Sequence, residues 1–462
     1  MKRANSPLAA GCVSLLAAAT LMAGNVVAAD EETPSLLQFY TGPNGSYARA
    51  TLEVDLGFFG QGDSWFGNSR ENLGKKSDYW WESLVRPGLD MQYVLPDSQS
   101  FYGRIDAVQA NTFGGVDASG TNGPFYDTSE DVGDLRIDRA YMGWRSGTLF
   151  GSLGDDFLDL SFGRIQYFYG DGFLLGSQGF GGYNRAAYWI GSRKTADYAA
   201  VARMKSGNWS GDLVYFKADD RAKTDTKLGG GNINYAIENV VSLGAGFYML
   251  DSDDERRDSM NVYNLRGGIN PFALADGIPA LRPLRFDAEF VHEDAGRRKV
   301  VDIDNPDFAN GKAWHITASY AFEDVPWKPL LSYRYASFDE NYDSLFYHSS
   351  DWGTWFQGEI LGEYVLANEN LNSHMVKLRL QPIDPVTVNL IYYKFKLHDA
   401  TAGGVSSDKY ADEYDLIVDW AVTDYFSLSV VGAIATPDDA AKELTGGDNT
   451  WSYVMVLGGL KF

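Results

Sequence analysis

The sequence predicts an all-β protein: a transmembrane antiparallel β-barrel of eighteen strands with short periplasmic turns and long extracellular loops. Three observations predict this fold. Apolar and polar residues alternate with a period of two, the alternating runs are long, and the chain ends in an aromatic residue, Phe462. Alternation gives a strand one apolar and one wet face, and about 9–11 tilted residues cross a bilayer.

The alternation is clearest in three segments. In residues 47–57 the apolar side chains at 48, 50, 52, 54 and 56 are separated by Arg49, Thr51, Glu53 and Asp55. The same pattern recurs in residues 284–290 and 413–420. Each segment therefore reads as a strand with one lipid-facing and one water-facing side.

Composition excludes several other classes of protein. The 462 residues are 14% aromatic and 45% hydrophobic, and they carry a net charge of −23. Disordered chains are poor in aromatic residues, and a disulfide scaffold needs more than the one cysteine, Cys12. Nucleic acid is not expected as a partner, because binding phosphates requires a basic face.

The first 29 residues read as a secretory signal peptide. A basic start precedes an apolar stretch, and the small residues at 27–29 fit a cleavage site. A lipoprotein signal ending at Cys12 is the alternative. We therefore expect export to the outer membrane of a Gram-negative cell, with residues 1–29 as the signal, 30–46 as a periplasmic leader and 47–462 as the barrel.

A soluble β-protein would also show alternation, but two features favour a membrane barrel. The strands are longer than the usual 5–6 residues. Aromatic residues also gather at strand ends, where they would form interfacial girdles. These clusters are Tyr79-Trp80-Trp81, Tyr392-Tyr393, Tyr425-Phe426, and Trp451 with Tyr453. Downstream of residue 30, no window approaches eighteen consecutive apolar residues, so a helical anchor is not expected.

Eighteen strands are predicted, and an even count keeps both termini on the periplasmic side. They lie near residues 47–57, 82–95, 100–112, 134–145, 157–168, 196–205, 208–218, 228–237, 241–250, 259–269, 283–293, 312–322, 328–338, 371–382, 385–397, 410–421, 425–436 and 451–462. Residues 354–367 could form another strand, but an odd count would reverse every later one. We therefore place them in the seventh extracellular loop, as a short helix.

Several segments resemble the alginate-export family of outer-membrane proteins. They are Trp355-Phe-Gln-Gly-Glu359, Asn370-Leu371, Asn389-Leu-Ile-Tyr-Tyr-Lys-Phe395, Asp412-Glu-Tyr-Asp-Leu-Ile-Val418 and Pro437-Asp-Asp-Ala440. Phe162-Gly163-Arg164 followed by Gly170-Asp171 resembles the family's Gly-Arg strand, with Ile165 in place of the usual Gln. The resemblance implies an eighteen-stranded barrel that exports a uronic-acid polysaccharide through a lumen lined by arginines.

The polar faces of the strands predict which charges line the lumen. The cations are Arg49, Arg86, Arg104, Arg139, Arg164, Arg203, Lys205, Arg266, Arg285, Arg334, Lys377 and Arg379. The acids are Glu53, Asp55, Asp90, Asp106, Asp212, Asp287, Glu289, Glu413, Asp415 and Asp419. These near-equal numbers leave open whether the cations bind substrate or form ion pairs that brace the barrel. The predicted substrate pathway is Arg139, Arg164, Arg185, Arg104, Arg86, Arg334 and Arg379.

Most of the remaining acidic charge lies in the predicted loops and reads as solvated surface, or as cation bridges to lipopolysaccharide. Loop seven, residues 339–370, carries seven acids and no base. Loop three, residues 169–195, differs because Arg185, Arg193 and Lys194 outnumber Asp171. Its glycines allow tight turns, so we expect it to enter the barrel and bring Arg185 near Arg164 and Arg139.

Enzyme activity is not predicted. The five histidines are too scattered to indicate a metal site, although His315 could face the lumen, and no cofactor is expected. Two functions remain, a passive channel for an anionic polysaccharide and a porin for small polar or anionic solutes. Expected partners are outer-membrane lipid and lipopolysaccharide, the barrel-assembly machinery through Phe462, and a periplasmic polysaccharide secretion complex.

Overall fold

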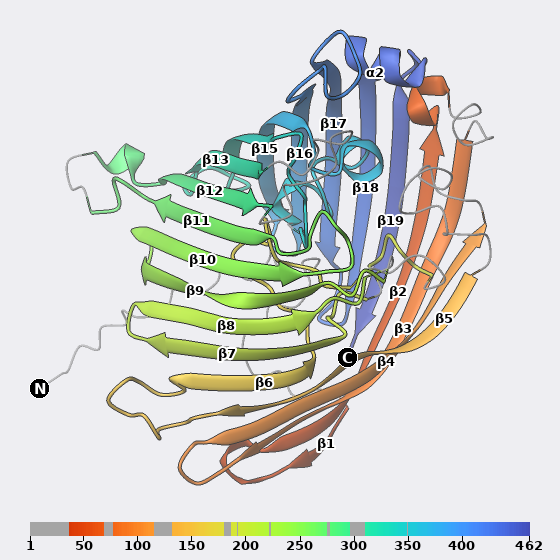
Figure 1. Cartoon of the computed structure of the whole chain (residues 1–462). Coiled ribbons are helices and arrows are strands. Elements are labelled where there is room, and N and C mark those ends of the chain that lie inside the picture. Colours follow the sequence, from red (N-terminus) through yellow and green to blue (C-terminus); the bar gives the residue numbers. More distant parts are fainter. Residues whose placement is uncertain are drawn as a thin grey trace, which may run out of the picture.

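The chain forms a closed antiparallel β-barrel of eighteen strands, β2 to β19, in the computed structural model (Figure 1). The structure describes residues 37–68, 77–114, 132–179, 186–191, 193–220, 223–274, 278–295, 310–348 and 350–462. Each strand pairs with its neighbours in sequence, and β19 pairs with β2 to close the barrel. Closure satisfies the backbone groups of every strand without leaving an open edge in the bilayer.

The strands are long and regular. Their bounds are β2 Tyr47–Gly62, β3 Ser77–Val94, β4 Ser100–Gly114, β5 Val132–Arg145, β6 Leu158–Arg164, β7 Tyr198–Ser206, β8 Trp209–Lys217, β9 Lys227–Ile237, β10 Val241–Asp251, β11 Asn261–Ile269, β12 Leu284–Asp294, β13 Gly311–Ala321, β14 Leu330–Phe338, β15 Leu371–Ile383, β16 Val386–Leu397, β17 Lys409–Ala421, β18 Phe426–Pro437 and β19 Trp451–Lys461. Each of the eighteen predicted ranges overlaps one of them, so the strand count is confirmed.

One further strand was not predicted. Within the predicted periplasmic leader, residues 30–46, Gln38–Thr41 forms β1, which pairs with the start of β2. The partner β19 ends at Lys461 opposite Glu53, so the first residues of β2 would otherwise present an unpaired edge. β1 covers this edge, and a 3-10 turn, Pro43–Gly45 (η1), connects it to β2.

Both ends of the described chain lie on the side of the barrel where most connections are short. Leu52 and Phe462 exchange two backbone hydrogen bonds of 3.2 and 2.9 Å, and Ala50 donates to the carbonyl of Leu37. The predicted polarity is therefore confirmed. It makes even-numbered strands run from the periplasmic to the extracellular side and odd-numbered strands run back.

The outward face is apolar, as expected for a wall in contact with lipid. Large hydrophobic side chains such as Leu243, Leu265, Ile316 and Leu390 are exposed on it. Among the described residues, no helix has the length and apolar character needed to cross a membrane.

The aromatic clusters form girdles only in part. Trp80, Tyr393, Trp451 and Tyr453 are buried inside the barrel instead of facing lipid. The reason is the strand geometry itself, because successive side chains point to opposite faces. An adjacent pair such as Trp80–Trp81 must therefore place one ring inside, whereas Trp451 and Tyr453, two residues apart, share the inward face. Interior rings pack on one another and on loops that enter the lumen. Trp451, for example, packs on Tyr364 of loop seven, with ring centroids 6.0 Å apart, whereas Trp80 stacks on Phe59 of the neighbouring strand β2 at 5.1 Å.

Two loops fold into the extracellular half of the barrel. Loop three joins β6 to β7, and loop seven joins β14 to β15 through a 3-10 helix, Ser350–Trp352 (η5), and a π-helix, Gly362–Leu366 (η6). Phe173, Leu174, Phe346 and Trp352 of these loops are fully buried. The inner wall at this height is also apolar, so loops and wall share one hydrophobic core.

The inward course of loop three and the absence of a strand at 354–367 are thus confirmed. The solvated reading of loop seven is wrong, because Glu359 and Glu363 are buried. The other short helices in the described ranges are Ser64–Gly67 (η2), Pro279–Leu281 (η3) and Asp439–Thr445 (α2). Asp438 caps α2 by accepting from the Asp439 amide, and Gly446 ends it at a φ of 70°.

The seam between β19 and β2 gives a first prediction. Deleting Phe462 removes two backbone hydrogen bonds to Leu52 and a ring stack on Tyr425, whose centroid lies 5.3 Å away. We expect the free energy of unfolding to fall by about 1–3 kcal/mol. Phe462→Ala keeps the backbone bonds and should lose about 1 kcal/mol. Urea titration followed by heat-modifiable gel migration measures both, and equal losses would contradict the role given to the backbone bonds.

Candidate functional site: a charged lumen narrowed by two loops

The charges of the lumen begin with a cluster on the wall formed by β2 to β5. Arg86 lies 2.6 Å from Glu53 and 3.2 Å from Asp138, which is on β5. Arg139 and Arg104 share Asp106, at 2.6 and 2.9 Å. We call this set of six residues the wall cluster. Its three cations and three acids are mutually paired, so the ion-pair interpretation applies to Arg86, Arg104 and Arg139.

Arg164 stands where β6 ends and loop three begins. Its guanidinium contacts Asp197 at 2.8 Å and Asp219 at 2.6 Å, and its Nε donates to the Asp138 carbonyl at 3.0 Å. The preceding Gly163 has a φ of 129°, and a Cβ there would lie 2.3 Å from the Ala140 carbonyl oxygen. The Gly-Arg pair therefore ends the strand early, at Arg164 instead of the predicted 168, and turns the chain into the barrel.

Loop three is fastened to the wall by its backbone. The amide of Ile190 donates to the Glu82 carboxylate at 2.8 Å, and the amide of Ala187 donates to the Thr112 hydroxyl at 2.9 Å. Arg185 lies outside the described residues, so its predicted approach to Arg164 stays a prediction. Two other basic residues of the loop are placed: Arg193 pairs with Asp219, and Lys194 contacts His348 of loop seven.

Lys194 carries the positive charge of loop three toward the wall cluster. It interacts electrostatically with Arg86, Glu53 and Asp138 of that cluster. Burial, followed by the charge of Arg86, lowers the pKa of Lys194 to about 8. Loop three thus brings a cation, Lys194, close to the paired arginines of the wall cluster.

Arg334 and Lys377 form a second charged group, below loop seven. Both contact the Asp351 carboxylate, at 2.7 and 2.8 Å. The Arg334 guanidinium also lies 4.0 Å from the centroid of the Trp352 ring and donates to the Thr317 hydroxyl. An acid of loop seven therefore neutralises two predicted lumen cations, of which Arg334 is also a predicted pathway residue. The strand pattern could not reveal this pairing because Asp351 is outside any strand.

Four predicted lumen cations have no ion pair among the described residues. They are Arg203, Lys205, Arg266 and Arg379, and each lies in the periplasmic half of its strand. Arg266 is held by Asn234 at 2.6 Å and by the Tyr169 ring, 4.5 Å from its centroid. Arg379 has no ion pair or side-chain hydrogen bond in the described part of the chain. Among the predicted pathway residues it is therefore the cation most available to a solute.

Loop seven is held by an acid on the barrel wall. The Glu413 carboxylate accepts from the amides of Glu359, Ile360 and Leu361 at 2.6, 2.8 and 2.9 Å. Such a nest of amides binds an anion because three N–H groups converge on it. Gln357, Asn368 and Ser373 add hydrogen bonds that are buried. The loop is therefore positioned by polar contacts as well as by its apolar core.

Two carboxyl groups of loop seven are buried and form no ion pair with a cation of the described residues. Burial, with the nearby Glu413 carboxylate, raises the pKa of Glu359 to about 8. Burial and the charge of Glu359 raise the pKa of Glu363 well above its ordinary value. Loop seven thus fits the lumen best when these groups carry protons.

The raised pKa of Glu359 predicts how the position of loop seven depends on pH. A Glu359 pKa raised from 4.5 to about 8 means that the packed loop binds the proton more tightly than a displaced loop. The free energy holding loop seven in the lumen should therefore be highest below pH 4.5 and fall as the pH rises to about 8. The displaced population should grow by up to about tenfold per pH unit in that window.

Protease cleavage of loop seven in detergent-solubilised protein measures that population. Glu359→Gln should weaken the pH dependence between pH 5 and 8. Glu369 is an exposed residue of the same loop and pairs with Arg256. As a control, Glu369→Gln should keep the wild-type pH profile of cleavage. An unchanged profile in Glu359→Gln would contradict the assignment.

Comparison with known proteins agrees with this architecture. The profile of the Alginate export family matches residues 86–454. Among solved structures, OpdQ of Pseudomonas aeruginosa has 11% identity and a TM-score of 0.55, with 90% of this chain and 98% of that chain covered. A BenF-like porin of Pseudomonas fluorescens Pf-5 has 10% identity and a TM-score of 0.57, with the same coverage.

OccAB4 of Acinetobacter baumannii has 12% identity and a TM-score of 0.55, with 91% of this chain and 100% of that chain covered. At these identities the solved structures establish the fold alone, which is that of an outer-membrane barrel. A search of curated proteins gave no match.

Proposed function

The chain belongs to the alginate export family, and on that basis we propose that it is an outer-membrane channel for passive secretion of an anionic, uronate-type polysaccharide. The family match over residues 86–454 is the observation that carries the proposal. The lumen would be the path of the polymer, because a barrel of eighteen strands encloses an aqueous channel unless something narrows it. Here loops three and seven narrow it, and cations of the wall lie next to both loops.

The electrostatics of the lumen suit transit better than tight binding. Most cations near the loops are matched by acids, as in the wall cluster and in the Arg334–Lys377–Asp351 group. A polyanion passing them would meet weak, repeated attraction that must compete with the internal acids. Conduction requires this balance, since a solute that binds strongly at one place does not leave.

The cations without an ion pair would attract a polyanion at the periplasmic end of the lumen. Arg203, Lys205 and Arg379 face the periplasmic half of the lumen, where a polymer made inside the cell would arrive. Two charges 4 Å apart attract by about 1 kcal/mol in bulk water and by about 4 kcal/mol at an effective dielectric of 20. A few such cations can therefore raise the local concentration of uronate groups without trapping the chain.

A porin for small polar or anionic solutes is the second candidate. The near balance of charge in the wall cluster favours it, because a channel without strong net charge passes small solutes of either sign. The two functions differ in what blocks the pore. Uronate oligomers should occupy an export channel over several residues, whereas a porin should pass or ignore them.

The proposed partners follow from the surface and from the ends of the chain. Residues 1–29 would direct export, and Phe462 would be read by the barrel-assembly machinery. Lipid would cover the apolar outer face, and the acidic extracellular loops would contact lipopolysaccharide through divalent cations. A periplasmic polysaccharide secretion complex would deliver the polymer to the short-turn side.

Single-channel recording in planar bilayers tests the function. Block of an anion-preferring current by oligouronates added on the periplasmic side supports export, whereas weak selectivity without block supports a porin. Arg379→Gln removes an unpaired cation and should weaken block about fivefold, as expected for the loss of about 1 kcal/mol. Arg379→Lys keeps the charge and should retain most of the block.

The matched control removes a negative charge from the same part of the lumen instead of a positive one. Asp419 faces the same part of the lumen and interacts electrostatically with Lys377 and Arg379. Asp419→Asn should therefore strengthen oligouronate block. Equal block in Arg379→Gln, Asp419→Asn and the wild type would exclude this part of the wall from the path.

A further inference from the structure

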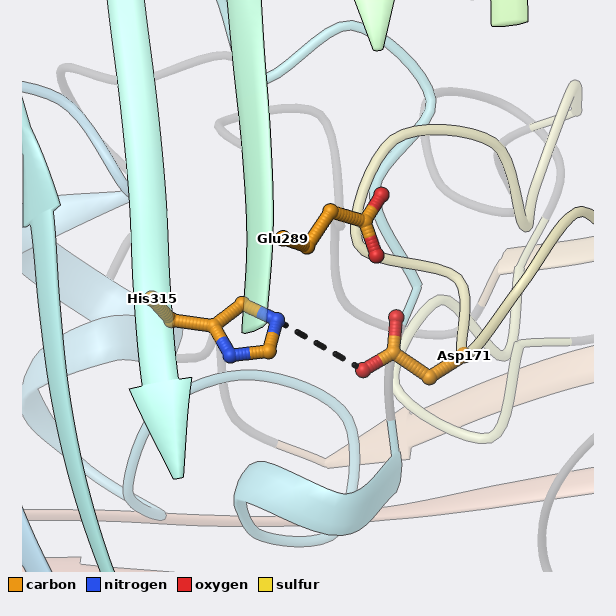
Figure 2. A group of neighbouring side chains, drawn as sticks. All are labelled: Asp171, Glu289 and His315. Carbon is orange, nitrogen blue, oxygen red and sulfur yellow. Dashed lines mark ion pairs between the residues drawn. The ribbon is translucent and has the colours of Figure 1, made fainter. Parts of the chain in front are cut away.

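Three side chains from separate segments converge where loop three meets the barrel wall. Asp171 comes from loop three, Glu289 from β12 and His315 from β13, and Figure 2 shows their polar groups pointing toward one another. One ligand-type atom of each residue lies within 4.8 Å of the others. Glu289 and His315 are direct partners in the β12–β13 register, so the wall presents them side by side.

Both carboxylates are oriented by a hydrogen bond to one oxygen. The Phe173 amide donates to Asp171 Oδ1 at 3.0 Å, and the Asn264 side-chain amide donates to Glu289 Oε1 at 2.7 Å. Asp171 Oδ2 instead faces His315 Nε2, at 3.9 Å. Partners of this kind fix the direction of ligands in metal sites and leave the other oxygen available.

The imidazole of His315 supplies an independent observation. Its side chain is 3% exposed, and neither ring nitrogen has a hydrogen-bond partner among the described residues. The ring is fixed by edge contacts with Phe173 and Trp352, whose centroids lie 4.9 and 5.2 Å away. A buried imidazole without partners is costly, and this one is aimed at two carboxylates.

The nearby cations are engaged elsewhere. Arg334 contacts Asp351 and Thr317, and Arg266 contacts Asn234 and the Tyr169 ring. Neither forms an ion pair with Asp171 or Glu289 in the described structure. Both arginines act on the two carboxylates electrostatically from a distance, and a divalent cation would provide a direct counter-charge.

We propose that Asp171, Glu289 and His315 bind a divalent transition-metal ion of the Zn²⁺ type. An imidazole nitrogen with two carboxylate oxygens suits zinc and related metals, whereas calcium and magnesium prefer oxygen ligands alone. Tetrahedral ligands at about 2.0–2.1 Å from zinc lie about 3.4 Å apart. Binding would require side-chain rotations that bring the ligand atoms, now within 4.8 Å of one another, to that spacing, and water would complete the coordination.

The site would tie loop three to the wall. Glu289 and His315 belong to the barrel, and Asp171 alone belongs to the loop. Bound metal would therefore hold the loop in its inward position, next to Trp352 of loop seven. The inference stands on these contacts and does not depend on which solute the channel carries.

Zinc binding to the untagged full-length chain tests the proposal. Protein refolded from inclusion bodies carries no lipopolysaccharide, and treatment with EDTA removes metal before calorimetric titration with ZnCl₂. The wild type should bind one tight zinc ion per chain, and Co²⁺ should give a visible absorption band. Asp171→Asn, Glu289→Gln and His315→Phe should each weaken zinc binding by about tenfold or more.

The matched control is the Glu340–His398 pair, a carboxylate 3.0 Å from a histidine. In the described part of the chain this pair does not belong to a group of three metal-type ligands. Glu340→Gln should bind zinc like the wild type. Heat-modifiable migration confirms that each variant is folded, and the two near-isosteric acid variants decide the matter if His315→Phe does not fold. Absence of a tight ion in the wild type, or equal zinc affinity in Asp171→Asn and Glu289→Gln, would overturn the proposal. Neither result would bear on polysaccharide export, because no transport is measured.

Discussion

The structure depends on one constraint: every backbone N–H and C=O group at membrane depth must be satisfied by the protein itself. Closure of β19 onto β2 meets this constraint, and the exchange of hydrogen bonds between Phe462 and Leu52 completes it. β1 then covers the remaining edge of β2. A closed barrel of eighteen strands has a wide lumen, and the inward loops fill part of that lumen. Their apolar side chains meet apolar inner walls in the extracellular half, so the barrel holds a hydrophobic core inside as well as a lipid-facing surface outside.

The strands could be predicted because each carries its own evidence. A lipid-facing strand needs a period of two, and this period is visible in a single segment of sequence. The position of residues 354–367 in a loop followed from the even strand count, since an extra strand would have reversed the direction of every later strand. β1 could not be found in this way, because four residues contain too little pattern. The orientation of Trp80 and Trp451 required the exact register of each strand, which the clustering of aromatic residues does not supply.

The candidate site was predictable as a set of positions but not as a set of interactions. The polar faces placed Arg86, Arg139 and Arg334 toward the lumen, and the structure places them there. Their partners come from elsewhere: Asp138 lies two strands away from Arg86, and Asp351 lies in loop seven. Such pairs depend on the diameter of the barrel and on how far a loop reaches into it. The same reasoning explains why Asp171, Glu289 and His315, far apart in sequence, gave no metal pattern until the fold brought them together.

Loops three and seven act as one body because their contacts are both polar and apolar. Leu175 forms a β-bridge with Phe346, the His348 amide donates to the Gly172 carbonyl at 2.9 Å, and Phe173 stacks near Trp352 at 6.0 Å. Moving either loop alone would expose these buried rings to water and leave backbone groups unpaired. A polymer that needs a wider path must therefore displace both loops together. The links of each loop to the wall, through Glu82 and Thr112 for loop three and Glu413 for loop seven, then determine how readily the pair moves.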